Sequence, residues 1–434
     1  MKILAIDIGS TYLKGAVLET QTEQLLEKQA VPMPEKMKSE QPQRFEIDAE
    51  AIYMAAKILI DALIEKYPDV ASIWIDTQMH GHILTAPDGS GPKTYISWQD
   101  GLAEPLLPEL AEQLGQEALI RMGTRYKAGL TVCSYYVRHQ GQRQTAPMRL
   151  HTLGGYLIYR LSGNKETAHI CHESMAASLG LYDCADRCWN KDTIRVIGAE
   201  QLILPRMIPH TEQGGEYRGI PLYGDIGDHQ ASVYGLDEAD DKSIILTLGT
   251  AGILCMPAEQ FVREGMESRP YFHGLRLLTR TRQPGGRTLD VLIQFYRQCA
   301  QLFTGQEVSV PQMWDILLNE LPADGKGLRV LPDYFIGGGQ GEISGISGSN
   351  LEPSALFAAG IAGLVDILAE TVCEFRALRP QACKIVLCGG SLARLAYLQN
   401  ALAEKTGLQV VCSEKQDEAL YGLAKLAKEL KFDI

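Results

Sequence analysis

The chain has 434 residues, more than one hydrophobic core usually supports, so two or more domains are expected. Its composition, 45% hydrophobic and 22% charged, is typical of a soluble globular protein. With 41 Lys and Arg against 53 Asp and Glu, the formal net charge is −12. This charge argues against nucleic acid or an anionic membrane as a partner, because both bind basic faces.

The N-terminal sequence MKILAIDIGS is typical of a strand and shows no secretory signal. The longest apolar run, around residues 244–257, contains two glycines and is shorter than the ~20 residues that a membrane span needs. The ten cysteines include no C-x-x-C pair, which favours reduced thiols. We therefore predict a cytoplasmic protein.

Residues 2–19 predict a β-hairpin, in which two β-rich arms flank the turn Asp7-Ile-Gly-Ser-Thr11. Asp48 is expected to cap a helix whose apolar residues recur at helical spacing, with Pro68 just past its end. A strand at 72–76 then leads into Thr77-Gln-Met-His-Gly81. Strands that alternate with helices in this way predict an α/β fold.

An aromatic residue and an acid, Trp98 and Asp100, interrupt the polar stretch that follows. Helical segments are expected at roughly 104–122 and 147–161, with Gly163 as the stop. Residues 205–223 are rich in Pro and Gly, and we expect them to connect the two halves of the chain.

Residues 224–252 combine two kinds of chemistry. Asp228 opens an expected short helix, and a second hairpin follows with the turn Leu248-Gly-Thr-Ala-Gly252 between apolar arms. Such a turn offers backbone N–H groups and a hydroxyl, which suit phosphate oxygens. A carboxylate near a phosphate cradle is the minimal equipment for phosphoryl transfer. The two hairpins are also the strongest internal symmetry of the sequence.

Three further stretches complete the second half. Residues 269–287 contain five arginines, typical of a solvated surface hairpin, with contact to a phosphorylated sugar or nucleotide as the alternative. A flexible glycine-rich loop is expected at 337–348 and a long apolar helix at about 354–376. The strand 384–388, the Gly389-Gly390 turn and a helix through Thr406 predict a place where a base or ribose approaches the backbone.

The acidic motifs each allow two interpretations. Asp7 belongs either to an ordinary β-turn or to a site that holds magnesium through water. Lys14 is either a solvated strand residue or a positive charge near the transferred group. Asp228 is either a helix cap or the base that takes a hydroxyl proton from a substrate.

The polar and aromatic residues of the first half are equally open. Met79 and His80 either fill the core or contact a substrate. Trp98 and Asp100 form either a buried aromatic and a loop cap or part of a sugar site, in which a ring face stacks on the indole and polar groups take hydroxyls. Three other chemistries lack their motifs: the zinc H-E-x-x-H pattern, the G-x-S-x-G nucleophile turn and the Walker loop.

The order of these motifs resembles that of the FGGY family of carbohydrate kinases, and the match runs almost the full length of the chain. It rests on Asp-Ile-Gly-Ser-Thr at the start, Gln-Met-His-Gly near residue 80, Trp-Gln-Asp near 100, Gly-Asp-His-Gln near 228, Leu-Gly-Thr-Ala-Gly near 250 and Cys-Gly-Gly-Ser near 390. The resemblance implies an actin-like ATPase (ribonuclease H-like) α/β fold, with two domains around a nucleotide cleft. We expect the division at residues 1–222 and 223–434.

The resemblance also implies roles for individual residues. Asp228 would be the catalytic base and Asp7 the acid linked to magnesium. The nucleotide would contact residues of both hairpins and of the glycine turn: Asp7, Gly9, Ser10, Thr11, Lys14, Gly249, Thr250, Gly389, Gly390 and Arg394. The sugar would contact Gln78, Met79, His80, Trp98, Asp100 and Asp228.

Within the family the sequence is most similar to sedoheptulokinases, with xylulokinases next. Three residues depart from the family pattern on the sugar side: Thr77, Leu102 and Met175. We expect ATP- and Mg²⁺-dependent phosphorylation of a primary hydroxyl of a ketose, sedoheptulose or a pentulose such as xylulose. A non-catalytic nucleotide-dependent switch or sugar sensor is the alternative, and a homodimer stays open as an oligomeric state.

Overall fold

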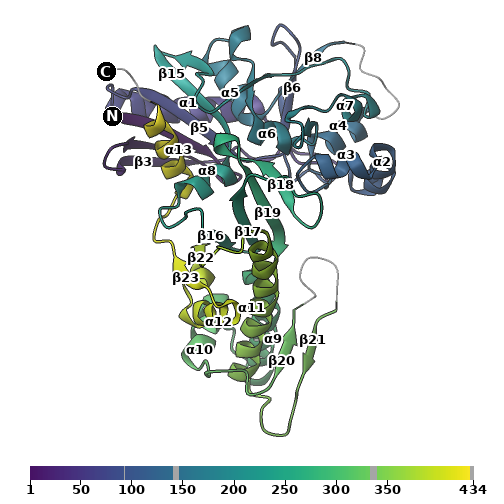
Figure 1. The fold of residues 1–434 in the computed structure, drawn as a ribbon, viewed down its shortest axis with the longest axis vertical. Helices are drawn as coiled ribbons and strands as arrows, with labels where there is room; N and C mark the ends of the chain where they lie inside the picture. Colours follow the sequence, from purple (N-terminus) through teal and green to yellow (C-terminus); the bar gives the residue numbers. More distant parts are fainter. Residues whose placement is uncertain (92, 140–145, 333–339, 431–434) are drawn as a thin grey trace. The chain divides into compact units, whose positions relative to one another are not determined.

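The computed structural model describes residues 1–91, 93–139, 146–332 and 340–430 (Figure 1). The chain forms two compact units that are discontinuous in sequence. Unit 1 comprises Met1–Leu236, Pro257–Leu278 and Lys415–Ile434, and unit 2 comprises Asp237–Met256 and Thr279–Glu414. The expected division of the family domains at residue 222 stays a prediction, whereas packing places Asp228 in unit 1.

The central sheet of unit 1 has six strands in the order β14-β15-β5-β1-β2-β3. β1 and β2 are antiparallel, which confirms the predicted hairpin, while β5 and β15 run parallel to β1. The strands are β1 Lys2–Ile8, β2 Tyr12–Glu19, β3 Gln24–Pro32, β5 Ser72–Thr77, β14 Gly215–Tyr217 and β15 Ile220–Gly227. Parallel strands carry their carboxyl ends at one edge of the sheet, which is where such folds build their sites.

Helix α1 (Ala49–Lys66) begins as predicted, because the Asp48 carboxylate accepts a hydrogen bond of 2.9 Å from the Glu50 amide. Its apolar face packs on the sheet together with α5 (Leu153–Leu161), around a core that includes Leu4 and Ile6 of β1. Helices α8 (Asp228–Gly235) and α13 (Glu418–Glu429) pack against each other, and α13 also contacts β1 and β5.

Unit 1 also holds a second sheet and several short elements. The sheet order is β12-β8-β6-β7-β4, formed by β4 Glu46–Asp48, β6 His82–Thr85, β7 Thr94–Ile96, β8 Met148–His151 and β12 Leu202–Ile203. Two strand pairs are β9 Ile170–His172 with β13 Arg206–Ile208 and β10 Tyr182–Asp183 with β11 Cys188–Trp189. The remaining helices are α2 Leu107–Leu114, α3 Gln116–Arg121, α4 Thr131–His139, α6 Glu173–Ser178, α7 Lys191–Val196 and the 3₁₀ turns η1 Glu104–Leu106, η2 Glu166–Ala168 and η3 Phe272–Gly274.

Two helices expected in unit 1 differ from the structure. The segment 104–122 is broken into η1, α2 and α3, because Gly115 takes φ 78° and ends α2. The segment 147–161 starts as strand β8, which pairs with β6, and the helix begins only after Thr152, whose hydroxyl accepts from the Gly155 amide. Helical spacing alone did not reveal the strand, because its partner is distant in sequence.

The expected connection at 205–223 is wrong. These residues form β13, β14 and the first half of β15, all inside unit 1. Arg218 and Gly219 have positive φ angles of 51° and 80° and make the two-residue turn between β14 and β15. The glycine therefore serves a tight hairpin within the sheet, so the high Pro and Gly content does not mark a link between halves.

Unit 2 is built on a sheet with the order β18-β19-β17-β16-β22-β23, in which β16, β22 and β23 lie wholly in unit 2. The strands are β16 Ser243–Leu248, β17 Gly252–Ala258, β18 Glu267–Pro270, β19 Arg276–Gln283, β22 Lys384–Gly389 and β23 Gln409–Cys412, with β20 Arg329–Leu331 and β21 Glu342–Ser344 as a separate pair. The helices are α9 Gly286–Thr304, α10 Val310–Asn319, α11 Pro353–Leu378, η4 Ser391–Arg394 and α12 Ala396–Thr406.

These bounds confirm the second hairpin, the long apolar helix and the strand–turn–helix at 384–406. The expected glycine-rich loop at 337–348 lies partly outside the described residues, and residues 342–344 form β21 rather than a loop. Helix α11 is long and apolar enough to cross a membrane by length and composition, but 72% of its most apolar window is buried. Its contacts with α9, α12 and β20 are those of a core helix.

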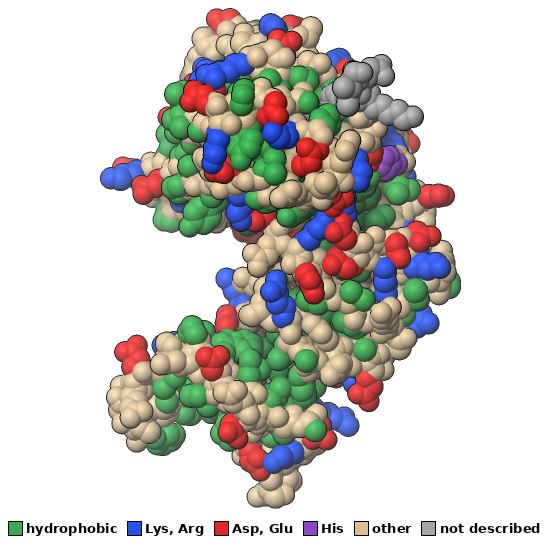
Figure 2. All heavy atoms as spheres, turned by 90° about the vertical axis from the view of Figure 1, so that its left-hand side faces the viewer, with side chains coloured by type: hydrophobic (Ala, Val, Ile, Leu, Met, Phe, Trp, Pro, Cys, Tyr) green, Lys and Arg blue, Asp and Glu red, His purple; other side chains and the backbone are tan. Residues whose placement is uncertain are grey.

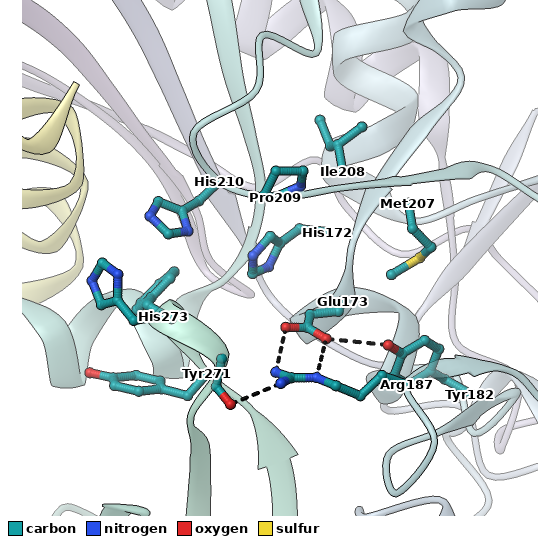
Figure 3. A pocket seen from close by; sticks show the side chains of 12 residues that line it. His172, Glu173, Tyr182, Arg187, Met207, Ile208, Pro209, His210, Tyr271 and His273 are labelled. Atoms are coloured by element: carbon teal, nitrogen blue, oxygen red, sulfur yellow. Dashed lines mark hydrogen bonds and ion pairs between the residues drawn. The ribbon is translucent and has the colours of Figure 1, made fainter. Parts of the chain in front are cut away.

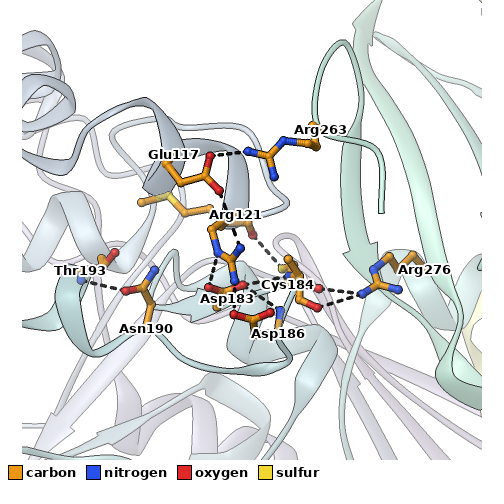
Figure 4. A network of polar contacts seen from close by, with 11 residues as sticks. Glu117, Arg121, Asp183, Cys184, Asp186, Asn190, Thr193, Arg263 and Arg276 are labelled. Atoms are coloured by element: carbon orange, nitrogen blue, oxygen red, sulfur yellow. Dashed lines mark hydrogen bonds and ion pairs between the residues drawn. The ribbon is translucent and has the colours of Figure 1, made fainter. Parts of the chain in front are cut away.

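The segment 257–278 is tied to the rest of unit 1 by a polar network (Figure 4). Arg276 donates to the carbonyl oxygens of Cys184 and Ala185 at 3.1 and 3.3 Å, and Arg263 pairs with Glu117. Arg121 in turn pairs with Asp183 at 2.6 Å. Arg276 is thus engaged with unit 1 and does not fit a purely solvated arginine hairpin.

Acidic and basic side chains are interspersed over the face of the molecule drawn in Figure 2. None of the ten cysteines forms a disulfide bond, and five of them are buried: Cys133, Cys171, Cys184, Cys255 and Cys388.

The crossing of α8 and α13 depends on glycine at the points of closest approach. A Cβ on Gly422 would lie 1.9 Å from the Ala231 carbonyl oxygen, and one on Gly235 would lie 1.9 Å from the Glu418 carbonyl oxygen. We predict that Gly422→Ala lowers the free energy of unfolding by about 1–3 kcal/mol through overpacking. Chemical denaturation measures this change.

Gly348→Ala is the matched control, because a Cβ there meets no atom within 4 Å and no positive φ strains the residue. Helix propensity alone would make Gly422→Ala stabilising by about 1 kcal/mol. An unchanged or increased stability of this variant would therefore contradict the close crossing.

Candidate active site

Three carboxylates meet at the carboxyl ends of adjacent parallel strands in unit 1. Asp7 lies on β1, Asp76 lies opposite it on β5, and Asp228 follows the end of β15 as the first residue of α8. Since Gly227 pairs with Thr77, the register of β15 brings Asp228 next to the other two. Asp7 is 7% exposed and Asp76 is fully buried.

Asp76 is the most deeply buried of the three acids. Neither of its carboxyl oxygens has a hydrogen-bond donor among the described residues. Burial raises the pKa of Asp76 well above its usual range, and the charges of Asp7 and Asp228 raise it further. The raised pKa favours the protonated form of Asp76, which lets two carboxyl groups share one buried site.

Asp7 keeps more of its charge because a cation faces it. Burial raises the pKa of Asp7, and Lys14, whose Nζ lies 3.3 Å from Asp7 Oδ2, opposes the rise. Lys14 also pairs with Asp417 at 3.1 Å, and Lys28 holds the other oxygen of Asp417 at 2.6 Å. The lysine expected near the phosphates is thus held between two acids and lies opposite Asp7 in the hairpin register.

Asp228 is half-buried and has the pKa that a general base requires. Burial is the largest cause and the charge of Asp7 the second, and together they raise the pKa of Asp228 to about 7. The His229 amide donates to Asp228 Oδ1 at 2.8 Å and opposes the rise, as do the charges of Arg269 and Lys127. A carboxylate whose pKa lies near the working pH is largely ionised and is still basic enough to accept a proton from a hydroxyl group.

The tip of the first hairpin is open. Gly9 lies in a tight turn in which its amide donates to the Tyr12 carbonyl at 3.0 Å. The side chains of Ser10 and Thr11 are exposed. Gln78 donates from Nε2 to the Gly9 carbonyl at 3.4 Å, so the turn is joined to the residues expected to bind the sugar.

The residues Gln78, Met79 and His80, which are expected to bind the sugar, directly follow β5, and Gln78 contacts Trp98. Gln78 is buried and accepts a 3.1 Å hydrogen bond from the indole N–H of Trp98, while the Trp98 ring is 38% exposed. Lys127 lies 5.4 Å from the ring centroid. Met79 is buried, and its sulfur would lie 3.0 Å from a Cβ placed on Gly227, beside Asp228.

His80 is held in a backbone conformation that side chains rarely adopt, with φ 78°. Its amide donates to the Ser178 hydroxyl at 3.0 Å, and its carbonyl accepts from Thr131 at 3.2 Å. The ring Nδ1 lies 2.9 Å from the Ser178 carbonyl, which can only accept, so Nδ1 carries the proton. Burial lowers the pKa of His80 well below its usual range, and the neutral ring leaves Nε2 as an acceptor for a hydroxyl.

Asp100 differs from the other expected sugar contacts. Its carboxylate is fully buried and accepts from Arg138 at 3.1 and 2.7 Å, from the Phe45 amide at 2.9 Å and from the Leu102 amide at 3.3 Å. These donors occupy both oxygens. The geometry favours the loop-cap interpretation, in which Asp100 positions the segment that carries Trp98.

The three departures from the family pattern also have local explanations. Arg138 supplies the cation beside Asp100, where Leu102 offers only its backbone amide. Thr77 is buried at the end of β5 and donates to the Gln78 carbonyl at 3.2 Å. Met175 is buried in a small apolar cluster with Met79.

Two cations influence Asp228: Lys127, which the sequence did not single out, and Arg269, which it named only as the start of the arginine-rich hairpin 269–287. Arg269 is buried, pairs with Glu267 at 2.7 Å and lies 3.3 Å from His229 Nδ1. Glu267 also accepts from the Thr124 hydroxyl at 3.2 Å, which anchors β18 to the 124–127 segment that carries Lys127. Arg269 therefore does not belong to a solvated hairpin, and both cations influence Asp228.

Unit 2 brings its own expected nucleotide residues together. Gly249 and Thr250 are exposed at the tip of the second hairpin, where their carbonyl oxygens accept from the amides of Gly286 and Arg287 at 2.9 and 3.1 Å. Gly389 pairs with Leu248 in the parallel register, and the Gly390 amide donates to the Leu248 carbonyl at 2.9 Å.

The turn at Gly389-Gly390 requires glycine. Gly389 has φ 111°, and a Cβ on it would lie 2.4 Å from the Leu248 carbonyl oxygen. Backbone hydrogen bonds thus join the two glycine turns and the N-terminus of α9 within unit 2. Arg394 ends η4 with an exposed side chain.

The donor set of unit 1 fits magnesium. Mg²⁺ takes oxygen ligands and is usually held through one or two carboxylates and water. Asp7 offers a carboxylate, and the neighbouring Asp76 has two buried oxygens without a donor. Asp76 was overlooked because an acid inside an apolar strand attracts no motif, although its isolation within SIWIDT is a signal.

Asp76 generates a stability prediction. Below pH about 3.9 both the folded and the unfolded chain hold the proton. As the pH rises, Asp76 ionises in the unfolded chain before it does in the folded chain, because burial raises its folded pKa, so the free energy of unfolding falls. Asp76→Asn removes this penalty. We predict a higher Tm for the variant at pH 8, about 2–4 °C for each kcal/mol recovered, and little difference near pH 4.

Asp69→Asn is the surface control, since its pKa is lowered by Lys2 and its pH dependence has the opposite sign. Thermal unfolding followed from pH 4 to pH 8 separates the two. A Tm of Asp76→Asn at or below the wild-type value at pH 8 would contradict a protonated Asp76.

The chain is similar to known proteins in both sequence and structure. A family model for the N-terminal domain of the FGGY family of carbohydrate kinases matches residues 2–233. An uncharacterized sugar kinase of Archaeoglobus fulgidus is 26% identical over 280 residues, which cover 56% of this chain and 54% of that protein. Glycerol kinase of Saccharolobus islandicus is 27% identical over 237 residues, 50% of this chain and 45% of that protein. The chain spans about half the length of the curated relatives it matches.

Solved structures agree over nearly the whole chain. Xylulose kinase of Rhodospirillum rubrum superimposes with a TM-score of 0.84 at 17% sequence identity. Gluconate kinase of Lactobacillus acidophilus superimposes with a TM-score of 0.82 at 18% identity. Each superposition covers 99% of this chain and 89% of the solved chain. At such identities the likeness shows the fold, which is the predicted two-domain α/β fold of the actin-like ATPases. Together with the matched family model, this shows that the chain belongs to the FGGY family of carbohydrate kinases.

Proposed function

We propose that the protein transfers a phosphoryl group from ATP to a primary hydroxyl of a ketose. The observation that carries the proposal is Asp228, a carboxylate with a pKa of about 7 at the start of α8, beside a strip of hydroxyl-binding side chains. The helix does not use Asp228 as its cap, since the N-cap of α8 is Gly227 and no side-chain cap hydrogen bond is made, so a strongly perturbed acid there points to a functional role.

In this mechanism Asp228 accepts the proton of the attacking hydroxyl. The neutral Nε2 of His80 and the amide of Gln78 orient the sugar, and the exposed face of Trp98 stacks on it. Arg269 and Lys127 stabilise the ionised form of Asp228 before transfer. A positioned base of this kind typically contributes about 10²–10⁴-fold to the rate.

Phosphate binding is assigned to the hairpin tips. In unit 1, the tight turn at Gly9 presents the exposed hydroxyls of Ser10 and Thr11, and Lys14 supplies positive charge. In unit 2, Gly249, Thr250, Gly389 and Gly390 offer bare backbone, with Arg394 as a further expected contact. Magnesium near Asp7 would neutralise charge on the phosphate oxygens. Nucleotide use is supported by a relative of the same fold, a Plasmodium falciparum glycerol kinase whose structure was solved with ADP.

The choice of sugar rests on weaker support than the chemistry. The relatives of the same fold include kinases named for xylulose and gluconate, and curated relatives are named glycerol kinases. A pentulose such as xylulose is therefore a first candidate. Sedoheptulose rests on the motif resemblance alone.

A substrate panel tests the proposal. Coupled ADP release is measured with ATP and Mg²⁺ against ketoses, polyols and aldonates, including xylulose, sedoheptulose, glycerol and gluconate. We expect at least one ketose to raise ADP release about 10²-fold or more over the rate without sugar, because acceptor and base are then aligned.

The identity of the stimulating compound decides the finer assignment. Stimulation by glycerol or gluconate alone would retain a kinase but reject a ketose as its acceptor. No stimulation across the panel, together with measurable ATP binding, would reject the kinase and favour the nucleotide-dependent switch or sugar sensor.

A further inference from the structure

A cavity of unit 1, with a volume of about 360 Å³, takes no part in the proposed mechanism (Figure 3). Three histidines line it: His172 of β9, His210 after β13 and His273 in η3. Glu429, the last residue of α13, approaches two of these rings. The three groups His210, His273 and Glu429 come from chain segments that are far apart in sequence.

Their donor atoms have the spacing of metal ligands. Glu429 Oε2 lies 3.4 Å from His210 Nε2, and Glu429 Oε1 lies 3.4 Å from His273 Nε2. All donor atoms of the three residues fall within 4.8 Å of one another. Zinc–ligand bonds of about 2.0–2.1 Å in a tetrahedron place neighbouring ligand atoms about 3.3–3.4 Å apart. Direct N–H···O hydrogen bonds are shorter, about 2.9 Å.

The surroundings hold these ligands in place. The His210 ring packs edge-on against Phe272 and against His273, with centroids 5.3 Å apart in both pairs. The Tyr234 hydroxyl contacts Glu429 and lies 3.2 Å from His273 Nε2. Metal sites depend on contacts that orient the rings, which the packing of His210 supplies, whereas the Tyr234 hydroxyl contacts the ligand atoms themselves.

We propose that His210, His273 and Glu429 bind a divalent transition-metal ion, with Zn²⁺ as the reference ion. Two imidazoles and one carboxylate suit Zn²⁺ and its neighbours in the first transition row, whereas Mg²⁺ prefers oxygen donors and competes poorly. Three protein ligands leave at least one coordination position for water or a small anion.

The ion links three parts of unit 1. It ties the end of α13 to the segment after β13 and to the turn between β18 and β19. Helix α13 packs against α8, which carries both Tyr234 and Asp228. Binding of the ion therefore stabilises the packing of α13 against α8 at the end of α8 that lies opposite to Asp228. The site does not depend on the identity of the sugar or on phosphoryl transfer.

The test uses the full chain without a histidine tag, in reducing buffer after removal of metals. Co²⁺ is titrated and its visible absorption recorded, followed by displacement with Zn²⁺. We expect one saturable equivalent with weak bands typical of nitrogen and oxygen ligands. Glu429→Gln and His273→Ala should each weaken binding by more than the about 10–100-fold that loss of an outer contact causes. His139→Gln, on α4, is the control and should bind as the wild type does.

Thermal unfolding gives a second readout. Zn²⁺ should raise the Tm of the wild type and of His139→Gln but not that of His273→Ala, whose half-exposed side chain is not needed for folding. Absence of saturable binding, or wild-type binding by both ligand variants, would overturn the proposal and leave an ion-pair cluster only. Intense sulfur-to-cobalt absorption that persists in the variants would overturn it too, because cysteines would then hold the ion.

Discussion

Burying carboxylates next to one another is the constraint on which unit 1 depends. Asp7 and Asp76 face each other across β1 and β5, and Asp228 follows β15, so three acids meet where three parallel strands end. Like charges in a poorly solvated site cannot all remain ionised. The repulsion is relieved unevenly: the pKa of Asp76 is raised well above its usual range, Lys14 supports the charge of Asp7, and Asp228 is left with a pKa near neutrality.

The neighbouring elements hold in place the charged groups that set the pKa values of these three acids. The β1–β2 hairpin places Lys14 opposite Asp7, and the N-cap of α13 places Asp417 on the other side of Lys14. The hairpin of β18 and β19 brings the Arg269–Glu267 pair beside His229. Because α13 crosses α8 at glycine contacts, the helix that begins with Asp228 is held close to the sheet.

Local patterns in the sequence predicted the elements whose signals are local. Both hairpins, the Asp48 cap, strand β5, the start of α8 and the strand–turn–helix at 384–406 agree with the structure. Strands whose pairing partners are distant in sequence were not predicted. The segment of β8 was expected to be helical, and the segment of β14 and β15 was expected to connect the two halves of the chain. Pairing with β6 and with β5 is not visible in the residues themselves.

The candidate site shows the same limit. The motif residues Asp7, Gln78, His80 and Asp228 were identified and do lie together in unit 1, although their roles remain predictions. Asp76 and Lys127 were not identified, and Arg269 was named only as the start of an arginine-rich hairpin, because their importance comes from register and burial. Asp100 was expected at the sugar, yet the amides of Phe45 and Leu102 and two N–H groups of Arg138 take up its carboxylate.

The most direct test of the account is a single-turnover measurement of phosphoryl transfer by Asp228→Asn, beside the wild type and the surface control Asp69→Asn. The account predicts that the transfer step slows by about 10²–10⁴-fold while ATP binding stays within about twofold of the wild-type value. Transfer at nearly the wild-type rate in Asp228→Asn would contradict it, because the acceptor hydroxyl would then lose its proton to another group.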